Sequence, residues 1–546
     1  MMKSVMNSVS MMVLAALLAF PAYGRADEGH IQTGSPPERL GEVHFPVSCD
    51  PSVQKPFDRA VALLHSFWYD EAKRAFAAVA KSDPNCAMAY WGVAMTFFHP
   101  LWGMPEAAAL KEGAAAIGQA AAMGGGSDRE RGYIQALGAF YRDAEKRDHR
   151  SRSVAYEQAM ESLAARFPED REATIFYALA LNATAFPNDR NYTNQKKAGG
   201  LLEPLFAEMP NHPGVAHYLI HSYDNPLLAP RALAAARAYA KIAPSVPHAL
   251  HMPSHIFTRL GLWSESIQSN LASANAAEEE AVRSGNPAAR EPKFHAMDYL
   301  VYAYLQEGRD PEARKILEVL KLTRKEIPEG SASATYAASA IPVRYFFERH
   351  KWSEGLAIIT QKSSYPWTDA LIHFARAVGA AQAGKNVHAQ VETDMLAIIR
   401  DGLKKDNQTF WADQVEVQHR AAEGWLAHAK GETDKAIQFM RAAADLEESM
   451  EKSPVTPGPV LPAREMLAEF YMEARFPKQA LASYEAVLAS APNRFNALAG
   501  AAHAAEKLQE REKARSYYEK LLAVAGPDSP RPEIGEAKAF LSKEKP

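Results

Sequence analysis

Two histidine pairs with the spacing H-x-x-x-H constrain the fold of this 546-residue chain more than any other feature. The pairs are His217/His221 and His251/His255, and the differences 251 − 217 and 255 − 221 are both 34. A pattern that recurs at this interval is typical of helix–turn–helix repeats, which stack into a solenoid. Each repeat packs only on its neighbours, so a long chain need not divide into several compact domains. The spacing therefore predicts an all-α solenoid.

Small and aromatic residues at fixed spacing support the same prediction. Ala72 and Phe76 are followed by Pro84, an A-x3-F…P pattern in which the small residue lets two helices approach and the aromatic ring fills the gap. Proline then ends the second helix. These residues and the following segment AMAYWGVAMTFF (residues 87–98) resemble the tetratricopeptide-repeat superfamily. The resemblance implies a right-handed superhelical solenoid of about twelve helical hairpins.

Five shorter segments extend the resemblance to a group of exported bacterial tetratricopeptide proteins. They read HSFWYDEA, CAMAYWG, HPLW, HMPSHIFTRLGLW and VTPGPVLPARE. Later repeats carry a small residue at the position of Ala72, namely Ala232, Ser266, Ala313, Gly355, Ala389, Ala436, Ala480 and Ala514. Spacings above 34 predict longer loops at residues 123–150, 184–198, 275–293, 320–335 and 402–415.

The predicted organisation runs from an extended lead-in to a C-terminal cap. We expect a lead-in at 27–50, N-terminal repeats at 51–210, central repeats at 211–330, further repeats at 331–452, and C-terminal repeats with a capping helix at 463–546. Residues 453–462 (SPVTPGPVLP) hold four prolines, which exclude a helix. This connector is either a long loop between repeats or a strap that crosses the solenoid groove.

The first residues have the features of a secretory signal peptide, predicted over 1–26. Lys3 is followed by the 12-residue apolar stretch Val9–Phe20, and cleavage after Ala26 fits the small residues there. The stretch is too short to span a bilayer comfortably, although an uncleaved anchor is the alternative. The sequence thus predicts a periplasmic or secreted protein without a membrane span in its mature form.

Charge and cysteine content narrow the possible partners. The net charge of −4 makes the chain a poor electrostatic partner for nucleic acid, so none is expected. The two cysteines, Cys49 and Cys86, favour a disulfide in an oxidising compartment, with two separate buried thiols as the alternative.

One face of the central repeats gathers polar side chains. When the small residue of each repeat is numbered 20, positions 2, 5 and 9 of successive repeats include His217, His221, His248, His251, His255, His295, Asp298, Tyr302 and Arg344. Positions 4, 7, 8 and 11 form the apolar packing face instead. The resemblance implies that the opposite face lines a concave, ligand-binding groove.

Two functions follow from this groove. The first is binding of a protein segment, or of a small molecule, to a surface lined by His248, His295, Asp298, Tyr302 and Arg344. The second is metal binding by His217, His221, His251 and His255, because imidazoles four residues apart on a helix are spaced to share an ion such as zinc or copper. Histidines that only support the scaffold are a third interpretation. Pro253 leaves open whether the helix carrying His251 and His255 is kinked or begins there.

No recognised catalytic motif is present. H-E-x-x-H, G-x-S-x-G, the Walker A motif, G-x-G-x-x-G and C-x-x-C-H do not occur in the sequence. The sequence therefore favours a binding protein over an enzyme and assigns no catalytic residue.

Overall fold

The computed structural model describes residues 38–102, 104–186, 189–360 and 362–543. The chain divides into a unit of residues 1–38 and a unit of residues 39–546, and the fold given below is that of the second. The predicted signal peptide, residues 1–26, and most of the lead-in lie outside the described residues. Within the described ranges all regular structure is helical, and no helix there is both long enough and apolar enough to cross a bilayer.

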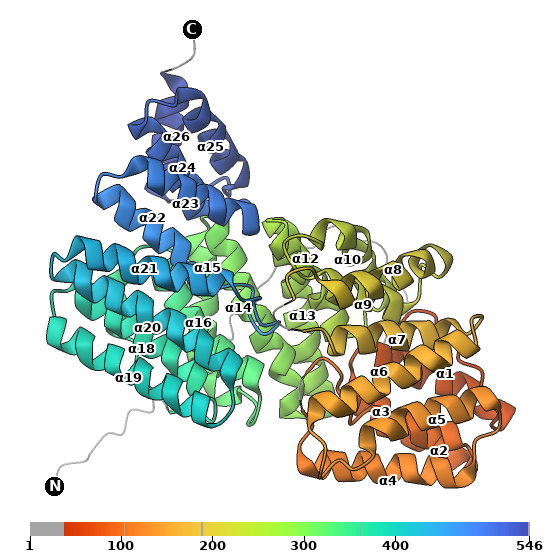
Figure 1. The fold of residues 1–546 in the computed structure, drawn as a ribbon. Coiled ribbons are helices and arrows are strands. Elements are labelled where there is room, and N and C mark those ends of the chain that lie inside the picture. The colour runs from red at the N-terminus through yellow and green to blue at the C-terminus, as the bar shows by residue number, and fades with distance from the viewer. Residues whose placement is uncertain (1–37, 103, 187–188, 361, 544–546) are drawn as a thin grey trace, which may run out of the picture. The chain divides into compact units, whose positions relative to one another are not determined.

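The helices of the first half follow one another with short connections (Figure 1). They are α1 Gln54–His65, α2 Tyr69–Ser82, α3 Ala87–Met95, α4 Ala107–Met123, α5 Asp128–Tyr141, α6 His149–Arg166, α7 Arg171–Ala183, α8 Thr193–Glu208, α9 Pro213–Tyr223, α10 Ala229–Ile242, α11 Pro247–His251, α12 Pro253–Arg259 and α13 Trp263–Ser284.

The second half contains the remaining helices. They are α14 Glu291–Gln306, α15 Asp310–Thr323, α16 Ala332–Phe347, α17 Trp352–Gly355, α18 Pro366–Gln382, α19 Asn386–Lys405, α20 Thr409–Ala429, α21 Thr433–Glu448, α22 Ala463–Glu473, α23 Pro477–Ser490, α24 Phe495–Lys507, α25 Arg511–Val524 and α26 Pro532–Ser542. Short 3-10 helices lie at Pro51–Val53, Pro287–Arg290 and Arg324–Glu326.

Successive helices pair into hairpins, and the first helix of one hairpin also packs on the first helix of another. Such contacts join α1 to α3, α9 to α12 and α14 to α16. With α11 and α12 counted together as one first helix, the described residues form twelve hairpins, and α26 follows the last. The fold is a helical solenoid of tetratricopeptide-like hairpins, as the 34-residue period predicts.

Small residues at the predicted positions explain why paired helices approach closely. Ala72 and Phe76 on α2 are fully buried, and a Cβ atom added to Gly92 on α3 would lie 2.2 Å from the Phe76 ring. The equivalent small residues are buried as well: Ala232, Ser266, Ala313, Gly355, Ala389, Ala436, Ala480 and Ala514. Because the side chains at these positions are small, the axes of the two helices can come close together.

Several predicted loops are helices instead. Helix α5 occupies residues 128–141 of the predicted loop at 123–150, because Ser127 and Glu130 form a capping box that starts it. The predicted loop at 402–415 is also mostly helical, since only residues 406–408 separate α19 from α20. The extra spacing between these repeats is therefore taken up by added or longer helices.

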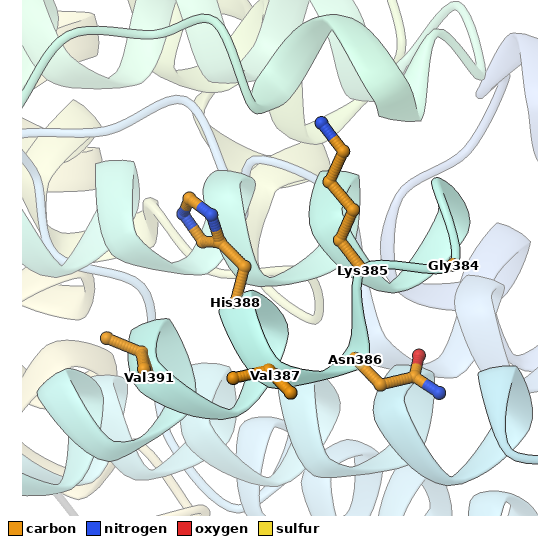
Figure 2. A pocket seen from close by; sticks show the side chains of 6 residues that line it. All are labelled: Gly384, Lys385, Asn386, Val387, His388 and Val391. Carbon is orange, nitrogen blue, oxygen red and sulfur yellow. The ribbon is translucent and has the colours of Figure 1, made fainter.

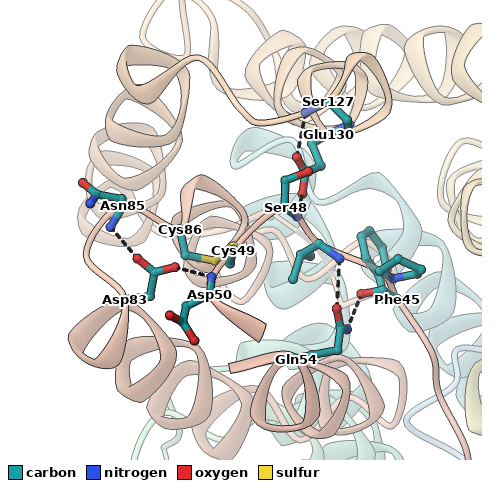
Figure 3. Close-up of a disulfide and its surroundings, with 12 residues drawn as sticks. Phe45, Ser48, Cys49, Asp50, Gln54, Asp83, Asn85, Cys86, Ser127 and Glu130 are labelled. Carbon is teal, nitrogen blue, oxygen red and sulfur yellow. Dashed lines mark hydrogen bonds between the residues drawn. A yellow bond between two sulfur atoms is a disulfide. The ribbon is translucent and has the colours of Figure 1, made fainter. Parts of the chain in front are cut away.

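The disulfide between Cys49 and Cys86 fastens the lead-in to the first repeats, which confirms the predicted pairing (Figure 3). Beside it, the carboxylate of Asp83 accepts a hydrogen bond from the backbone N–H of Asp50 at 2.8 Å. The N-terminal residues 39–50 are thus held against α2 and α3 without forming a helix themselves.

Candidate metal centre

Six histidines from neighbouring first helices lie together in the central repeats. Helix α9 contacts α12, and α11 contacts α14. The histidines form two groups, within each of which the candidate ligand atoms lie within 4.8 Å of one another. The first triad consists of His217, His221 and His248, and the second triad consists of His251, His255 and His295. Each triad combines an H-x-x-x-H pair with the position-2 histidine of the next repeat.

In the first triad, two imidazoles converge on His217. Its Nε2 atom lies 3.1 Å from the Nε2 atoms of both His221 and His248. The Phe67 ring packs against His217 with a centroid distance of 4.4 Å, and Trp102 lies 5.6 Å from His248. Aromatic side chains thus border this triad, while His221 and His248 remain partly exposed.

In the second triad, Nε2 of His251 lies 3.1 Å from Nε2 of His255. The His295 ring lies 4.4 Å from that of His251, and its buried Nδ1 atom has no hydrogen-bond partner in the described part of the chain. Pro253 interrupts the hydrogen-bond ladder, but Met252 before it has helical dihedral angles (φ −52°, ψ −36°). Helix α11 therefore ends at His251 and α12 begins at Pro253, but the helical backbone at Met252 keeps the two histidines in an i,i+4 relation.

Hydrogen bonds assign the proton positions in the second triad. The Nδ1 atom of His251 donates to Oδ1 of Asn270 at 2.7 Å, and the amide nitrogen of Asn270 donates to the carbonyl of Ser266. The Nδ1 atom of His255 donates to the carboxylate of Asp224 at 2.8 Å. Each neutral imidazole has one proton, so both Nε2 atoms bear lone pairs. A carbonyl or carboxylate on the other ring nitrogen is what metal-binding histidines ordinarily have.

The same rule applies to His217 in the first triad. Its Nδ1 atom donates to the backbone carbonyl of His65 at 2.6 Å, so its Nε2 atom also bears a lone pair. That lone pair faces His221 and His248 together, and it can accept only one linear hydrogen bond.

The facing Nε2 atoms of the second triad are two acceptors with no proton of their own between them. Burial, and then the charge that neighbouring histidines would carry, lower the pKa of His251 well below its ordinary value; burial also lowers the pKa of His255. Both rings are therefore neutral at pH 7, and their Nε2 lone pairs face each other at 3.1 Å. Two such lone pairs repel each other, and this repulsion is relieved by a metal ion, by a shared proton or by the hydroxyl of Tyr299, which lies 3.4 Å from Nε2 of His255.

Asp224 connects this triad to charged neighbours. Its Oδ1 atom accepts from Nε of Arg259 at 2.9 Å, and its Oδ2 atom accepts from Nζ of Lys452 at 3.2 Å. Burial raises the pKa of Asp224, but the charges of Lys452 and Arg259 outweigh this and hold it well below its ordinary value. Burial lowers the pKa of Lys452 to about 8. Asp224 is therefore a carboxylate at neutral pH, and it orients His255.

In a third histidine group nearby, every ring nitrogen has a hydrogen-bond partner within the protein. This Glu172 cluster consists of His65, Glu172 and His212, all buried. Nε2 of His65 and Nε2 of His212 each lie 2.9 Å from one oxygen of Glu172. The remaining lone pairs are used too, since Nδ1 of His65 accepts from the hydroxyl of Tyr218 and Nδ1 of His212 accepts from the N–H of Val215. No ring nitrogen of this cluster is left for a metal ion.

The predicted groove residues beyond the histidines lie under residues 449–462, which we call the strap. Asp298 and Arg344 form an ion pair in which both side chains are 0% exposed. Arg344 also donates to the strap carbonyls of Pro459 at 2.6 Å and Gly458 at 3.2 Å. The hydroxyl of Tyr302 accepts from Arg494. The connector at 453–462 is thus a strap rather than an open loop, and the predicted ligand-binding role of these residues remains a prediction.

Two other features of the described chain do not compete with the triads. Cys49, Asp83 and Cys86 lie close together, but both sulfur atoms are in the disulfide. A shallow hollow of about 580 Å3 lies at the start of α19, lined by residues such as Lys385, Val387 and His388 (Figure 2). The nearby Glu392 accepts from His388 and from Arg376, so His388 is engaged in an ion-pair network.

Comparisons with known proteins find only distant structural likenesses. No protein-family model matches this chain, and no curated protein matches it. Among solved structures, a human IFIT1 dimer with m7Gppp-AAAA is 12% identical over 80% of this chain and 90% of that chain, with a TM-score of 0.37. Yeast Tom70 is 11% identical over 91% of this chain and 96% of that chain, with a TM-score of 0.29. At these values neither likeness bears on function.

The structure therefore defines a class: a tetratricopeptide-like helical solenoid with a cluster of six histidines between adjacent repeats. The sequence pattern placed all six histidines on one face, but it assigned only four of them to a metal site. It missed Asp224, Asn270 and the carbonyl of His65, which fix the protons of the triads. No sequence signal marks these three, because each comes from a helix end or a helix outside the histidine pattern.

Proposed function

We propose that this protein binds transition-metal ions through its two histidine triads. The observation that carries the proposal is the His251/His255 pair, whose Nε2 lone pairs face each other at 3.1 Å while both Nδ1 protons are committed elsewhere. The unpartnered Nδ1 atom of His295 beside this pair supports the proposal further.

The donor chemistry selects the class of metal. Imidazole nitrogens suit zinc, copper, nickel and iron, whereas magnesium and calcium prefer carboxylate, carbonyl and water oxygens. Each triad supplies three nitrogens, the number that catalytic zinc sites in other proteins often use while keeping a further position open.

Elemental analysis of tag-free protein tests the proposal. Purified chain is loaded separately with zinc, copper, nickel and iron, dialysed, and assayed for metal per chain. We expect stoichiometric retention of at least one of these metals. The variant His221→Ala/His295→Ala removes one ligand from each triad, and both residues are partly exposed, so this variant should stay folded and lose the metal.

The matched control is His388→Ala/His419→Ala, which removes two histidines from α19 and α20 outside the triads. Its metal content should equal that of the wild type. Failure of the wild type to retain any of the four metals would overturn the proposal and leave a shared proton or the hydroxyl of Tyr299 as the account of the facing nitrogens.

Binding of an extended protein segment is the second candidate function. The specific observation that favours it is the way in which Arg344 holds the strap, by donating to two successive backbone carbonyls. A synthetic peptide of residues 453–462 should bind a variant whose own strap is replaced by a Gly/Ser linker, and an Arg344→Ala change should weaken that binding. Failure of the peptide to bind would remove this candidate.

We infer that the chain is exported, with cleavage after Ala26. The disulfide between Cys49 and Cys86 supports export, because disulfides persist in oxidising compartments. Expression in a bacterium followed by N-terminal sequencing of the periplasmic and secreted fractions should give a chain beginning at Asp27. A chain found only in the cytoplasm with Met1 intact would contradict this inference.

A further inference from the structure

One helix contributes a histidine to each of the two triads. Helix α11 (Pro247–His251) contributes His248 to the first triad and His251 to the second, and their ring centroids lie 6.5 Å apart. A second contact of the same length joins His221 on α9 to His255 on α12. The two metal-binding groups are therefore neighbours rather than separate sites.

Histidine binds metal ions as the neutral imidazole, so the two triads would supply six uncharged donors to the ions. The carboxylate of Asp224, which contacts the second triad, already accepts from His255, Arg259 and Lys452. Glu451 beside it pairs with Arg190 and Arg259, so the local protein charges largely cancel. Two metal dications placed in the triads would therefore have no anionic ligand among the described residues. Buried charge of this size is costly unless an opposite charge accompanies it.

Three nitrogens per ion also leave coordination positions open. His221, His248 and His295 are partly exposed, so each triad has at least one ligand side chain at the surface of the solenoid. A small anion that occupies an open position on each ion would supply the missing negative charge.

We propose that the two triads form one dinuclear centre and that this centre takes a small exogenous anion, such as hydroxide or azide, as a ligand shared by both ions. This inference rests on the proposed metal binding and deepens it. It assigns a ligand-binding site to the space where the two triads meet. The alternative is two independent mononuclear sites.

Copper(II) loading with electron paramagnetic resonance tests the inference. Wild-type chain should retain two copper ions, and its spectrum should show a half-field signal or less spin intensity than two isolated ions, because neighbouring ions couple. Azide should change this coupling.

Two variants isolate the triads: His221→Ala/His248→Ala keeps the second triad, and His255→Asn/His295→Ala keeps the first. In the latter, the amide nitrogen introduced at position 255 can still donate to Asp224.

Each variant should retain one copper ion with full spin intensity and no half-field signal. A wild-type spectrum equal to the sum of the two variant spectra, unchanged by azide, would overturn the dinuclear centre while leaving metal binding intact. Retention of a single ion by the wild type would also overturn it. Retention of no metal would overturn the proposed function itself. Circular dichroism of the variants distinguishes lost ligands from lost folding.

Discussion

The Glu172 cluster and the second triad both place buried histidines between neighbouring helices of the solenoid, and they differ in how the ring nitrogens are used. In the Glu172 cluster, every nitrogen of His65 and His212 has a partner within the protein. In the second triad, one nitrogen of each paired ring is fixed by Asn270 or Asp224, and the other faces a second lone pair.

This difference separates histidines whose ring nitrogens are all hydrogen-bonded within the protein from histidines that keep one ring nitrogen available, as the proposed metal site needs. Burial alone does not separate them, because His65 and His255 are both almost fully buried. The positions of the ring protons do separate them, because a ring whose Nδ1 donates a hydrogen bond has no proton on Nε2. In the Glu172 cluster the ionised carboxylate fixes the orientation of both rings. In the triads, the acceptors that fix the rings of His217, His251 and His255 bind Nδ1 and leave Nε2 available.

The largest expected effect comes from breaking the Glu172 cluster. Burial raises the pKa of Glu172, but His212 and His65 outweigh this and hold it far below its ordinary value. Glu172→Ala leaves two buried N–H groups unpaired and should reduce the free energy of unfolding by about 3–5 kcal/mol at pH 7, measured by urea denaturation. A depressed carboxyl pKa stabilises the fold above about pH 4.3 and loses its contribution as the pH falls, so the variant and wild type should converge in acid.

Glu169→Ala is the control for this variant, because the Glu169 side chain is 92% exposed. It should change the free energy of unfolding by less than about 0.5 kcal/mol. A Glu172→Ala protein as stable as the control would mean that the cluster does not stabilise the fold, and the comparison with the triads would fail.

Metal addition should stabilise the protein through the triads and not through the Glu172 cluster. A metal at one hundred times its dissociation constant should raise the free energy of unfolding by about 2.7 kcal/mol per occupied site, and EDTA should reverse the gain. The Glu172→Ala protein should start lower and show the same gain, whereas His221→Ala/His295→Ala should show none. Thermal unfolding with and without EDTA measures this. An equal gain in the histidine variant would place the metal elsewhere.

The sequence predicted the helices around the triads better than it predicted the triads themselves. The 34-residue period placed His217, His221, His251 and His255 on one face, and His248 and His295 at the matching position of the next repeats. Which histidine joins which pair depends on how adjacent first helices cross, and the period does not specify that. The helix at residues 128–141 was predictable, since Ser127 and Glu130 form a capping box that the sequence displays.

Partners that come from distant parts of the chain were not predictable. Lys452 reaches Asp224 across 228 residues, and Arg344 reaches Pro459 across 115. These contacts depend on the path of the strap, which the four prolines identify as extended without fixing its course. The sequence thus located the surface that carries the histidines, but the contacts of the strap with its surroundings could be found only from the structure.

A smaller effect is expected at the carboxylate behind the second triad. Asp224→Asn removes the negative charge that raises the basicity of His255, and such changes typically weaken metal binding 10–100-fold, or about 1.4–2.7 kcal/mol. Competition with a chromophoric chelator measures it in the His221→Ala/His248→Ala background, where only the second triad remains. The same change in the His255→Asn/His295→Ala background, where only the first triad remains, should have little effect. Equal weakening in both backgrounds would contradict a specific role for Asp224.

The smallest effect concerns Tyr299, which links the second triad to the strap. Its hydroxyl lies 3.2 Å from the carbonyl of Thr456 and 3.5 Å from that of Pro454, both in the strap, and 3.4 Å from Nε2 of His255, so it has one proton for three acceptors. A metal on His255 removes one acceptor, so the hydroxyl should then donate to the strap alone. Tyr299→Phe should therefore lower strap protection against hydrogen exchange by about 1 kcal/mol, and more clearly in metal-loaded protein than in metal-free protein.

Tyr365→Phe serves as the control, because its hydroxyl donates to the carbonyl of Gly330 instead of the strap. Strap protection that rises on metal loading in the wild type and in Tyr365→Phe, but not in Tyr299→Phe, would tie closure of the strap to occupation of the second triad. Protection that is independent of metal in all three proteins would separate the strap from the triad. Tyr299 would then belong with the Glu172 cluster, as a buried polar group whose only role is to stabilise the fold.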